Sequence, residues 1–307
     1  MILICLVTGF LGSGKTSFLK AIAARHADER IVYLVNEVSP LDVDGALLEE
    51  LDEGVVAIPG GSIFCRCLVT EFITRLTETP ERFGTVERPV AGVVIEASGI
   101  ADPRVIAQLL AETKLDGVYD LATVITVVDP ASLPKLVHTL PNIAAQIEAA
   151  DVVLLNKTDL FDDEEVAATE ALVREINPDA EVTRTVQCEA DLELFGEAPA
   201  RDMTGDYALC MDPNYEKLTV EFRAPVDMGR LMAGLTAARD DIYRAKGFVP
   251  TPNGLYYLDM SAAGLTTQLA DRDDVALGLA IITRGDECPL AEELAANIEA
   301  GELDARA

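Results

Sequence analysis

Five continuous apolar runs, separated by helical patterns, most constrain the fold of the first part of this chain. They are residues 2–8, 31–36, 90–98, 122–129 and 151–157. Strands that are buried on both faces appear as such unbroken runs, rich in β-branched residues. Helical patterns such as PRVIAQLLAETK and DEEVAATEALVREI lie between the runs. The sequence therefore predicts an α/β fold with a mainly parallel sheet that helices cover on both faces.

The pattern changes after about residue 190. Residues 191–214 show no sustained period and are predicted to form a linker. Strand patterns follow in KLTVEFRA, NGLYYLDMSA and ALGLAIITRG, a helical pattern lies in MGRLMAGLTAARDDIYRAK, and a short terminal helix comes last. We expect a first domain over residues 1–190, a small α+β domain over residues 215–298 and a frayed tail over residues 299–307.

The charge and cysteine content narrow the partners and the compartment. The 307 residues include 53 acidic and 24 basic side chains, for a net charge of −29 at pH 7. Such a surface repels phosphate backbones, so nucleic-acid binding is not expected. No apolar run is long enough to cross a bilayer, and no basic segment precedes the opening MILICLV, so we expect neither a membrane span nor a signal peptide. Six scattered cysteines indicate a reducing cytoplasm.

A glycine-rich loop follows the first apolar run. GFLGSGKT, from Gly9 to Thr16, fits the pattern G-x-x-x-x-G-K-[ST] between a strand and a helix. In such a loop, backbone N–H groups and the helix N-terminus surround phosphates. Lys15 would reach the β- and γ-phosphates, and the Thr16 hydroxyl would bind Mg²⁺. The expected phosphate-binding residues are Gly9, Gly12, Ser13, Gly14, Lys15, Thr16 and Ser17.

The segment NKTD closes the last of the five apolar runs and is similar to the guanine-recognition signature of GTPases. Asp159 can accept hydrogen bonds from guanine N1–H and the 2-amino group, while the stem of Lys157 packs on the purine. Adenine offers neither donor, so an unpaired carboxylate discriminates against it. Asn156, Lys157 and Asp159 are therefore the expected guanine site, and GTP is favoured over ATP.

The segment IEASG ends the third apolar run, where a GTPase needs its γ-phosphate sensor. Gly99 could offer its N–H group to the γ-phosphate. Glu96 could hold Mg²⁺ through water or orient the attacking water, and the alternative for it is a solvated carboxylate at a strand end. Lys15, Glu96 and Gly99 are thus the expected catalytic residues. Asp129 also follows an apolar run, and we expect it to stabilise a turn.

Together these motifs resemble the CobW family of P-loop GTPases, in particular its metallochaperone branch. GFLGSGKTS, VNEVSPLDVDGALL, IEASGIADP and NKTDL are similar to successive motifs of that family, and YRAKGF resembles the start of its C-terminal domain. The resemblance extends from residue 5 to about residue 285. It implies a GTPase whose nucleotide state governs the delivery of a metal, or of a metal-containing cofactor, to a client protein.

The resemblance also implies a metal-binding C-x-C-C motif, from which this chain departs. Aligned from the preceding glycines, Ser62 and Phe64 replace two of the family's cysteines. Aligned on the thiols, Cys65 and Cys67 match and only the last cysteine is missing.

Three interpretations of Cys65 and Cys67 stay open: contact with a metal or metal-containing cofactor, packing at a switch or client interface, and reversible oxidation. A soft ion such as Zn²⁺, Co²⁺ or Cu(I) could bind both thiolates with Glu37 as a third ligand.

The sequence thus predicts slow, client-stimulated and Mg²⁺-dependent hydrolysis of GTP to GDP and phosphate, with Zn²⁺ or Co²⁺ as candidate cargo. One alternative is a GTPase activator or gatekeeper of a corrinoid (cobalamin)-dependent enzyme that binds no free metal. Another is a P-loop kinase or ligase acting on a small substrate. The expected partners are GTP and a client metalloprotein or corrinoid protein in the cytoplasm, without nucleic acid or membrane; the oligomeric state is left open.

Overall fold

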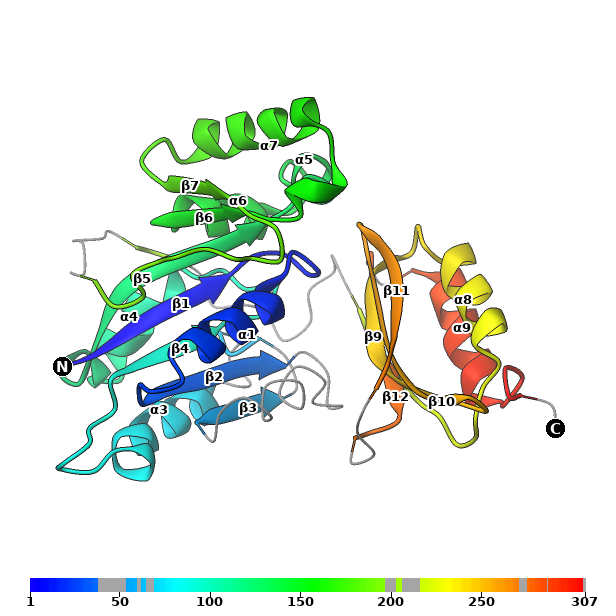
Figure 1. Cartoon of the computed structure of the whole chain (residues 1–307), viewed down its shortest axis with the longest axis horizontal. Helices are drawn as coiled ribbons and strands as arrows, with labels where there is room; N and C mark the ends of the chain where they lie inside the picture. The colour runs from blue at the N-terminus through cyan, green and yellow to red at the C-terminus, as the bar shows by residue number, and fades with distance from the viewer. Residues whose placement is uncertain are drawn as a thin grey trace. The chain divides into compact units, whose positions relative to one another are not determined.

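The structure is a computed structural model, and it describes most of the chain in two compact units. The first unit contains the described residues up to residue 205, and the second contains those from residue 216 onward. The described residues are 1–37, 54–59, 62–64, 69–196, 203–205, 216–270, 275–285 and 287–305. Each unit has a hydrophobic core of its own, and each is drawn in Figure 1.

The first unit contains a seven-stranded sheet in the order β3-β2-β4-β1-β5-β6-β7, and its paired strands are all parallel (Figure 1). The strands are β1 (Ile2–Thr8), β2 (Ile31–Glu37), β3 (Val55–Pro59), β4 (Gly92–Glu96), β5 (Tyr119–Val128), β6 (Val152–Leu155) and β7 (Glu181–Arg184). The helices are α1 (Lys15–Arg25), α3 (Val69–Phe83), α4 (Val105–Glu112), α5 (Leu133–Leu136), α6 (Pro141–Glu148) and α7 (Asp163–Ile176), with 3₁₀ turns η1 (Leu115–Gly117) and η2 (Thr158–Leu160).

Side chains of β1 alternate between two cores because neighbouring residues of a strand point to opposite faces. Cys5 and Val7 pack in the core that α1 covers, with Phe18 among its residues. Ile4 and Leu6 pack in the core on the other face, which α3 and α4 cover. A strand enclosed by helices on both faces must be apolar at every position, which explains the unbroken run in the sequence.

The second unit contains a five-stranded sheet in the order β11-β10-β9-β12-β8, and its paired strands are all antiparallel. Its elements are β8 (Lys217–Glu221), α8 (Met228–Ala237), β9 (Ile242–Thr251), β10 (Gly254–Ser261), β11 (Gly264–Leu269), β12 (Gly278–Thr283) and α9 (Pro289–Glu299). Leu231 and Leu235 of α8 and Leu294 and Ile298 of α9 pack on Leu279 and other strand residues in one core. Both helices therefore lie on the same face of this sheet (Figure 1).

The fold class is confirmed: a mainly parallel α/β unit precedes a small α+β unit. Five predicted strands occur as β1, β2, β4, β5 and β6. Strands β3 and β7 were missed because β3 ends in a proline and β7, at the edge of the sheet, has no buried residue. No helix in the described part of the chain is long and apolar enough to span a bilayer.

Two predictions for the second unit are wrong. The helix expected through DIYRAK ends at Ala237, and Ile242–Thr251 form β9 instead, because pairing with both β10 and β12 outweighs the local helical pattern. The tail is not frayed over its described residues: Leu303 C=O accepts from Asp227 N–H at 2.9 Å, and Ala305 N–H donates to Pro225 C=O at 2.9 Å. The boundaries of the predicted domains and linker stay predictions.

Candidate nucleotide-binding site

The glycine-rich loop joins β1 to α1, and its glycines adopt conformations that other residues avoid. Gly9, Gly12 and Gly14 have φ values of 132°, 80° and 120°. A Cβ atom at Gly9 would lie 2.2 Å from the carbonyl oxygen of Val127, and one at Gly14 would lie 2.3 Å from Nδ2 of Asn156. The loop therefore packs against Val127, near the end of β5, and Asn156, just after β6. Because its glycines have no side chains, backbone groups line its inner side.

Helix α1 begins at Lys15 without a side-chain cap, and no acidic residue occupies its first turn. The N–H groups and positive dipole end of such a helix are suited to an anion. Ser13 Oγ is buried and has no hydrogen-bond partner within the described part of the chain, and the same holds for Thr8 Oγ1 and Ser98 Oγ. Buried hydroxyl groups rarely go without a partner, so these three groups fit a site that binds a polar ligand.

Lys15 is buried, and its ammonium group lies back over the loop. Its Nζ donates to the carbonyl oxygen of Gly9 at 2.8 Å and to that of Phe10 at 3.3 Å. A lysine ammonium is a point charge with three donors on a flexible stem, so it can exchange carbonyl contacts for phosphate oxygens. Thr16 is partly buried and Ser17 is exposed on the next two positions of α1.

The NKTD segment follows β6 directly, and its three expected base-binding residues take different places. Asn156 is buried: its Nδ2 donates to Ser13 C=O at 2.9 Å, and its Oδ1 accepts from Cys188 N–H at 2.9 Å. Lys157 Nζ donates to Gly12 C=O, so its stem crosses the loop. Asp159 lies on the turn η2 with an exposed side chain and no hydrogen-bond partner within the described residues. Of the three residues, Asp159 thus has its carboxylate exposed to solvent, whereas Asn156 braces the phosphate loop.

The loop after β7 supplies a residue that sequence reasoning missed. Gln187 and Cys188 have φ values of 53° and 59°, and this turn brings Cys188 under the phosphate loop, with Sγ 3.4 Å from the carbonyl oxygen of Gly14. Burial raises the pKa of the Cys188 thiol to about 12, although Lys157 and Lys15 act in the opposite direction. A lone cysteine without ligand spacing gives no sequence signal for such a packing role.

The strand β4 delivers the IEASG segment to the same edge of the sheet. Glu96 is buried at the end of β4, in register with Val7 of β1 and Val35 of β2. Gly99 contacts the phosphate loop so closely that a Cβ atom there would lie 2.6 Å from the backbone nitrogen of Leu11. The structure therefore brings Glu96, Gly99 and Lys15 to one end of β1 and β4.

Asn36, the penultimate residue of β2, links the segments that follow β3 and β4, the two strands that flank β2 in the sheet. It is only 3% exposed, and its Oδ1 accepts from Ile63 N–H at 2.9 Å and from Ser98 N–H at 3.2 Å. Its Nδ2 donates to Ile58 C=O at 3.3 Å. One side-chain amide thus joins the segment before Cys65 to the loop that contains Gly99.

Asp129 has the turn role that the sequence predicted. Its Oδ1 accepts from Ala131 N–H at 3.0 Å and from Ser132 N–H at 3.1 Å. Burial raises the pKa of this carboxyl, while Lys157 and the hydrogen bonds from Ser132 and Ala131 pull the pKa down. Asp129 also borders a cavity of about 10 Å³ behind the phosphate loop, with Ser13 and Gln146, which is room for about one water molecule.

The predicted transition-metal site lies mostly outside the described residues. Cys65 and Cys67 lie outside the described residues, and Glu37 ends β2 with a side chain whose placement is not described. Within the described residues, no group of three or more histidine, cysteine, aspartate or glutamate side chains is arranged to hold a metal ion. The segment just before Cys65 is well packed: Ser62, Ile63 and Phe64 are buried, and Phe64 packs edge to face on Phe72 with ring centroids 6.0 Å apart.

A phosphate loop between β1 and α1, with NKTD at the end of β6 in a mainly parallel sheet, defines the class of this domain as a P-loop GTPase domain. Residues 3–184 match the family description "CobW/HypB/UreG, nucleotide-binding domain". The chain belongs to this family, and the family prediction made from the motifs is confirmed.

Several named proteins are similar to this chain. A zinc-regulated GTPase metalloprotein activator 1 of Schizosaccharomyces pombe is 32% identical over 196 residues, which cover 59% of this chain and 45% of that protein. The zinc chaperone YeiR of Escherichia coli is 34% identical over 157 residues, covering 50% and 46% of the two chains. The chain therefore matches about half the length of these relatives. Among solved structures, zinc-bound YjiA GTPase of E. coli aligns over 99% of both chains at 22% identity, with a TM-score of 0.44.

Proposed function

We propose that this protein hydrolyses GTP to GDP and phosphate, with Mg²⁺, and uses the reaction to deliver a transition metal or a metal-containing cofactor to a client protein in the cytoplasm. The names of its relatives, a zinc chaperone and a zinc-regulated metalloprotein activator, favour zinc as the first cargo to test. The acidic surface, with a net charge of −29, argues against nucleic acid as the client.

The geometry supports the following roles for the nucleotide-binding residues. The glycine cradle and the N-terminus of α1 would surround the phosphates, Lys15 would contact the β- and γ-phosphates, and the Thr16 hydroxyl would bind Mg²⁺. Asp159 would accept from guanine, with the stem of Lys157 beneath the base. Glu96 would position the attacking water and Gly99 would sense the γ-phosphate; the burial of Glu96 at the end of β4 and the contact of Gly99 with the phosphate loop support these roles.

One observation favours coupling between nucleotide and cargo: the amide of Asn36 binds both the Gly99 loop and the segment before Cys65. A shift of the Gly99 loop on loss of the γ-phosphate would therefore be felt by that segment through two buried hydrogen bonds to one oxygen. Cys65 and Cys67, with Glu37 as a third ligand, are the proposed metal-binding residues.

The test is a Zn²⁺ and Co²⁺ titration of the reduced protein with GTP, with GDP and without nucleotide, next to a Cys65→Ser/Cys67→Ser variant. We expect nucleotide-dependent binding that the double variant loses. Asn36→Asp and Asn36→Leu sharpen the test, because Asp keeps the oxygen that accepts from both N–H groups and Leu does not. Asn36→Leu should bind metal equally in all nucleotide states. Absence of binding in every state would contradict metal delivery and leave the corrinoid gatekeeper, tested by capture of a cobalamin-dependent protein.

A further inference from the structure

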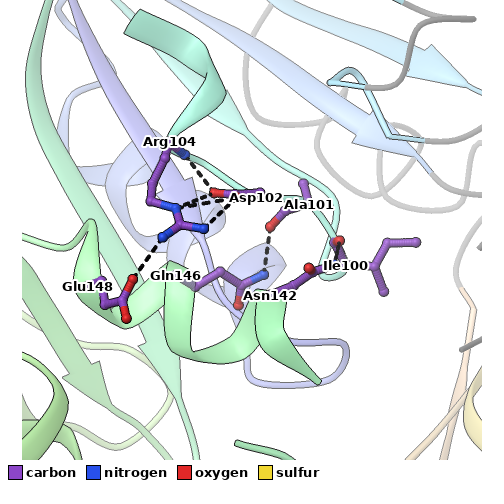
Figure 2. Close-up of polar contacts among 7 residues, drawn as sticks. All are labelled: Ile100, Ala101, Asp102, Arg104, Asn142, Gln146 and Glu148. Atoms are coloured by element: carbon purple, nitrogen blue, oxygen red, sulfur yellow. Dashed lines mark hydrogen bonds and ion pairs between the residues drawn. The ribbon is translucent and has the colours of Figure 1, made fainter. Parts of the chain in front are cut away.

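Two side chains of helix α6 bind carbonyl groups of the loop that follows β4 (Figure 2). Nε2 of Gln146 donates to Gly99 C=O at 3.2 Å and to Ala101 C=O at 3.0 Å, and Nδ2 of Asn142 donates to Ile100 C=O at 2.6 Å. Three consecutive carbonyl groups are thus bound by two amides that lie one helical turn apart.

The orientation of the Gln146 amide follows from chemistry. Carbonyl oxygens only accept hydrogen bonds, so both contacts require the NH₂ group and exclude the flipped amide. Both N–H donors are used, and the side chain is only 1% exposed. Its backbone is fixed as well, because Thr126 Oγ1 donates to Gln146 C=O at 2.7 Å. Gln146 is therefore a rigid support between β5 and the Gly99 loop.

These contacts decide where the N–H groups of the loop point. In a trans peptide the N–H group points opposite to the C=O group, and the described chain has no cis peptide. The bond from Gln146 to Gly99 C=O therefore turns Ile100 N–H away from α6. Ser98 C=O accepts from Ala101 N–H at 2.9 Å, which fixes the peptide that carries Gly99 N–H.

The two N–H groups oriented in this way, those of Gly99 and Ile100, have no acceptor within the described residues. Ser98 N–H donates to Asn36 and Ala101 N–H to Ser98, whereas Gly99 N–H and Ile100 N–H donate to no group within the described residues. Gly99 contacts the backbone of the phosphate loop at Leu11. Free N–H donors beside a phosphate loop are suited to a phosphate oxygen.

An ion pair anchors the far end of the same loop. Arg104 donates from Nη1 to Glu148 at 2.8 Å, at the end of α6, and from Nη2 to Asp102 at 2.8 Å (Figure 2). Because these side chains are partly exposed, the pair contributes little to stability. It does extend the contact between α6 and the loop through residue 104.

We propose that Gln146, assisted by Asn142, is a positioning residue for GTP hydrolysis: it binds the carbonyl groups of the loop so that Gly99 N–H and Ile100 N–H are presented to the γ-phosphate. This assignment rests on the proposed GTP hydrolysis. Gln146 touches neither the γ-phosphate nor the attacking water in this scheme. Gln146 should therefore affect the binding and hydrolysis of GTP, which has the γ-phosphate, and not the binding of GDP.

The test replaces Gln146 by methionine, which keeps the size and removes both donors. We expect kcat for GTP hydrolysis to fall by tenfold or more, since small misplacements of catalytic groups cost about 10²-fold. The preference for GTP over GDP should fall by a similar factor, while GDP affinity stays within about twofold. A folded Gln146→Met protein with wild-type kcat and wild-type GTP preference would overturn the proposal. Wild-type protein that binds GTP and GDP equally and hydrolyses neither would overturn the proposed function as well.

A matched control is Asn177, which directly follows α7 and binds carbonyl groups at the C-terminal end of α6. Asn177 Nδ2 donates to the carbonyl groups of Ile147, Glu148 and Ala150, at 2.8, 3.3 and 2.9 Å. Asn177→Leu thus also removes an amide that binds three carbonyls, yet it should lower thermal stability without changing the GTP-to-GDP preference. Equal loss of that preference in Asn177→Leu would show a general packing effect and overturn the specific role of Gln146.

Two further variants keep the proposal falsifiable if Gln146→Met does not fold. Asn142→Ala removes the single bond to Ile100 at a partly buried position and should lower kcat by about three- to tenfold, a cost typical of one hydrogen bond. In Gln146→Glu, a protonated carboxyl can donate to one carbonyl and an ionised one to none. Its kcat, relative to wild type, should therefore rise as the pH is lowered from 8 to 6. A flat ratio together with an unaffected Asn142→Ala would contradict the proposal.

Discussion

The two sheets of this protein distribute their buried polar residues differently. In the first unit, the ends of parallel strands and the turns after them hold Thr8, Asn36, Glu96, Ser98, Asp129 and Asn156, all buried. Among the described residues of the second unit, the buried polar ones are Lys246 and Thr283, which lie on different strands of an antiparallel sheet.

Strand direction explains the difference. Parallel strands all end at one edge, so the turns after β1, β2, β4, β5 and β6 meet there and can build a ligand site. Antiparallel strands end alternately at opposite edges, so the turns of the second unit do not converge in this way. The comparison assigns nucleotide chemistry to the first unit, and the following changes test it, in order of expected effect.

The largest effect is expected for Lys15→Ala. The variant loses the ammonium group that would contact the β- and γ-phosphates, so GTP turnover should fall below detection in a phosphate-release assay. Lys20→Ala, on the same helix, removes a lysine outside the loop and should retain turnover. Unchanged turnover in Lys15→Ala would contradict the GTPase assignment.

Next is the base specificity of Asp159. Asp159→Ala should reduce the preference for GTP over ATP by about 10²-fold or more, because the acceptor for the guanine N–H groups is lost. Competition of GTP and ATP for a fluorescent guanine nucleotide measures this preference. Asp163→Ala, on the adjoining helix α7, is the control and should keep it. Equal GTP preference in both variants would remove Asp159 from the base site.

Substituting one buried hydrogen-bonding residue in each unit compares the two units directly. Asn156→Ala leaves Ser13 C=O and Cys188 N–H without their partner and should lower the free energy of unfolding by ~2–4 kcal/mol, with loss of nucleotide affinity. In the second unit, Thr283→Val removes hydroxyl bonds to Glu216 N–H and Gly285 C=O and should cost ~1–2 kcal/mol. Denaturant unfolding and GDP binding measure both. A loss of GDP affinity in Thr283→Val would contradict the assignment of nucleotide binding to the first unit.

The smallest effect concerns alkaline pH. Burial raises the pKa of the Cys188 thiol from its ordinary value of 9.0 to about 12, so the folded state keeps a proton that the unfolded state releases. Its contribution to stability is full below about pH 9 and is lost as the pH rises toward 12. Cys188→Ser should flatten this part of the stability–pH profile in denaturant titrations at pH 8, 9 and 10. A profile as steep as that of the wild type would count against the buried neutral thiol.

The sequence predicted the phosphate loop, the guanine motif and the parallel sheet because each depends on local pattern: glycines, a lysine and unbroken apolar runs. It did not predict β9, whose strand form depends on pairing with β10 and β12. Cys188 and Gln146 were missed for a related reason. Their roles arise from contacts between residues far apart in the chain, such as Gln146 with Gly99, and no spacing records such contacts.

The close packing at Gly14 has a consequence for how this sequence can evolve. A side chain at Gly14 would collide with Asn156 Nδ2 and lie 3.0 Å from Cys188 Sγ, and the φ value of 120° at Gly14 strains any other residue there. Smaller residues at 156 and 188 could relieve the collision, but they would not relieve the backbone strain. In libraries randomised at 14, 156 and 188, functional sequences should therefore keep glycine at 14 whatever residues occupy 156 and 188.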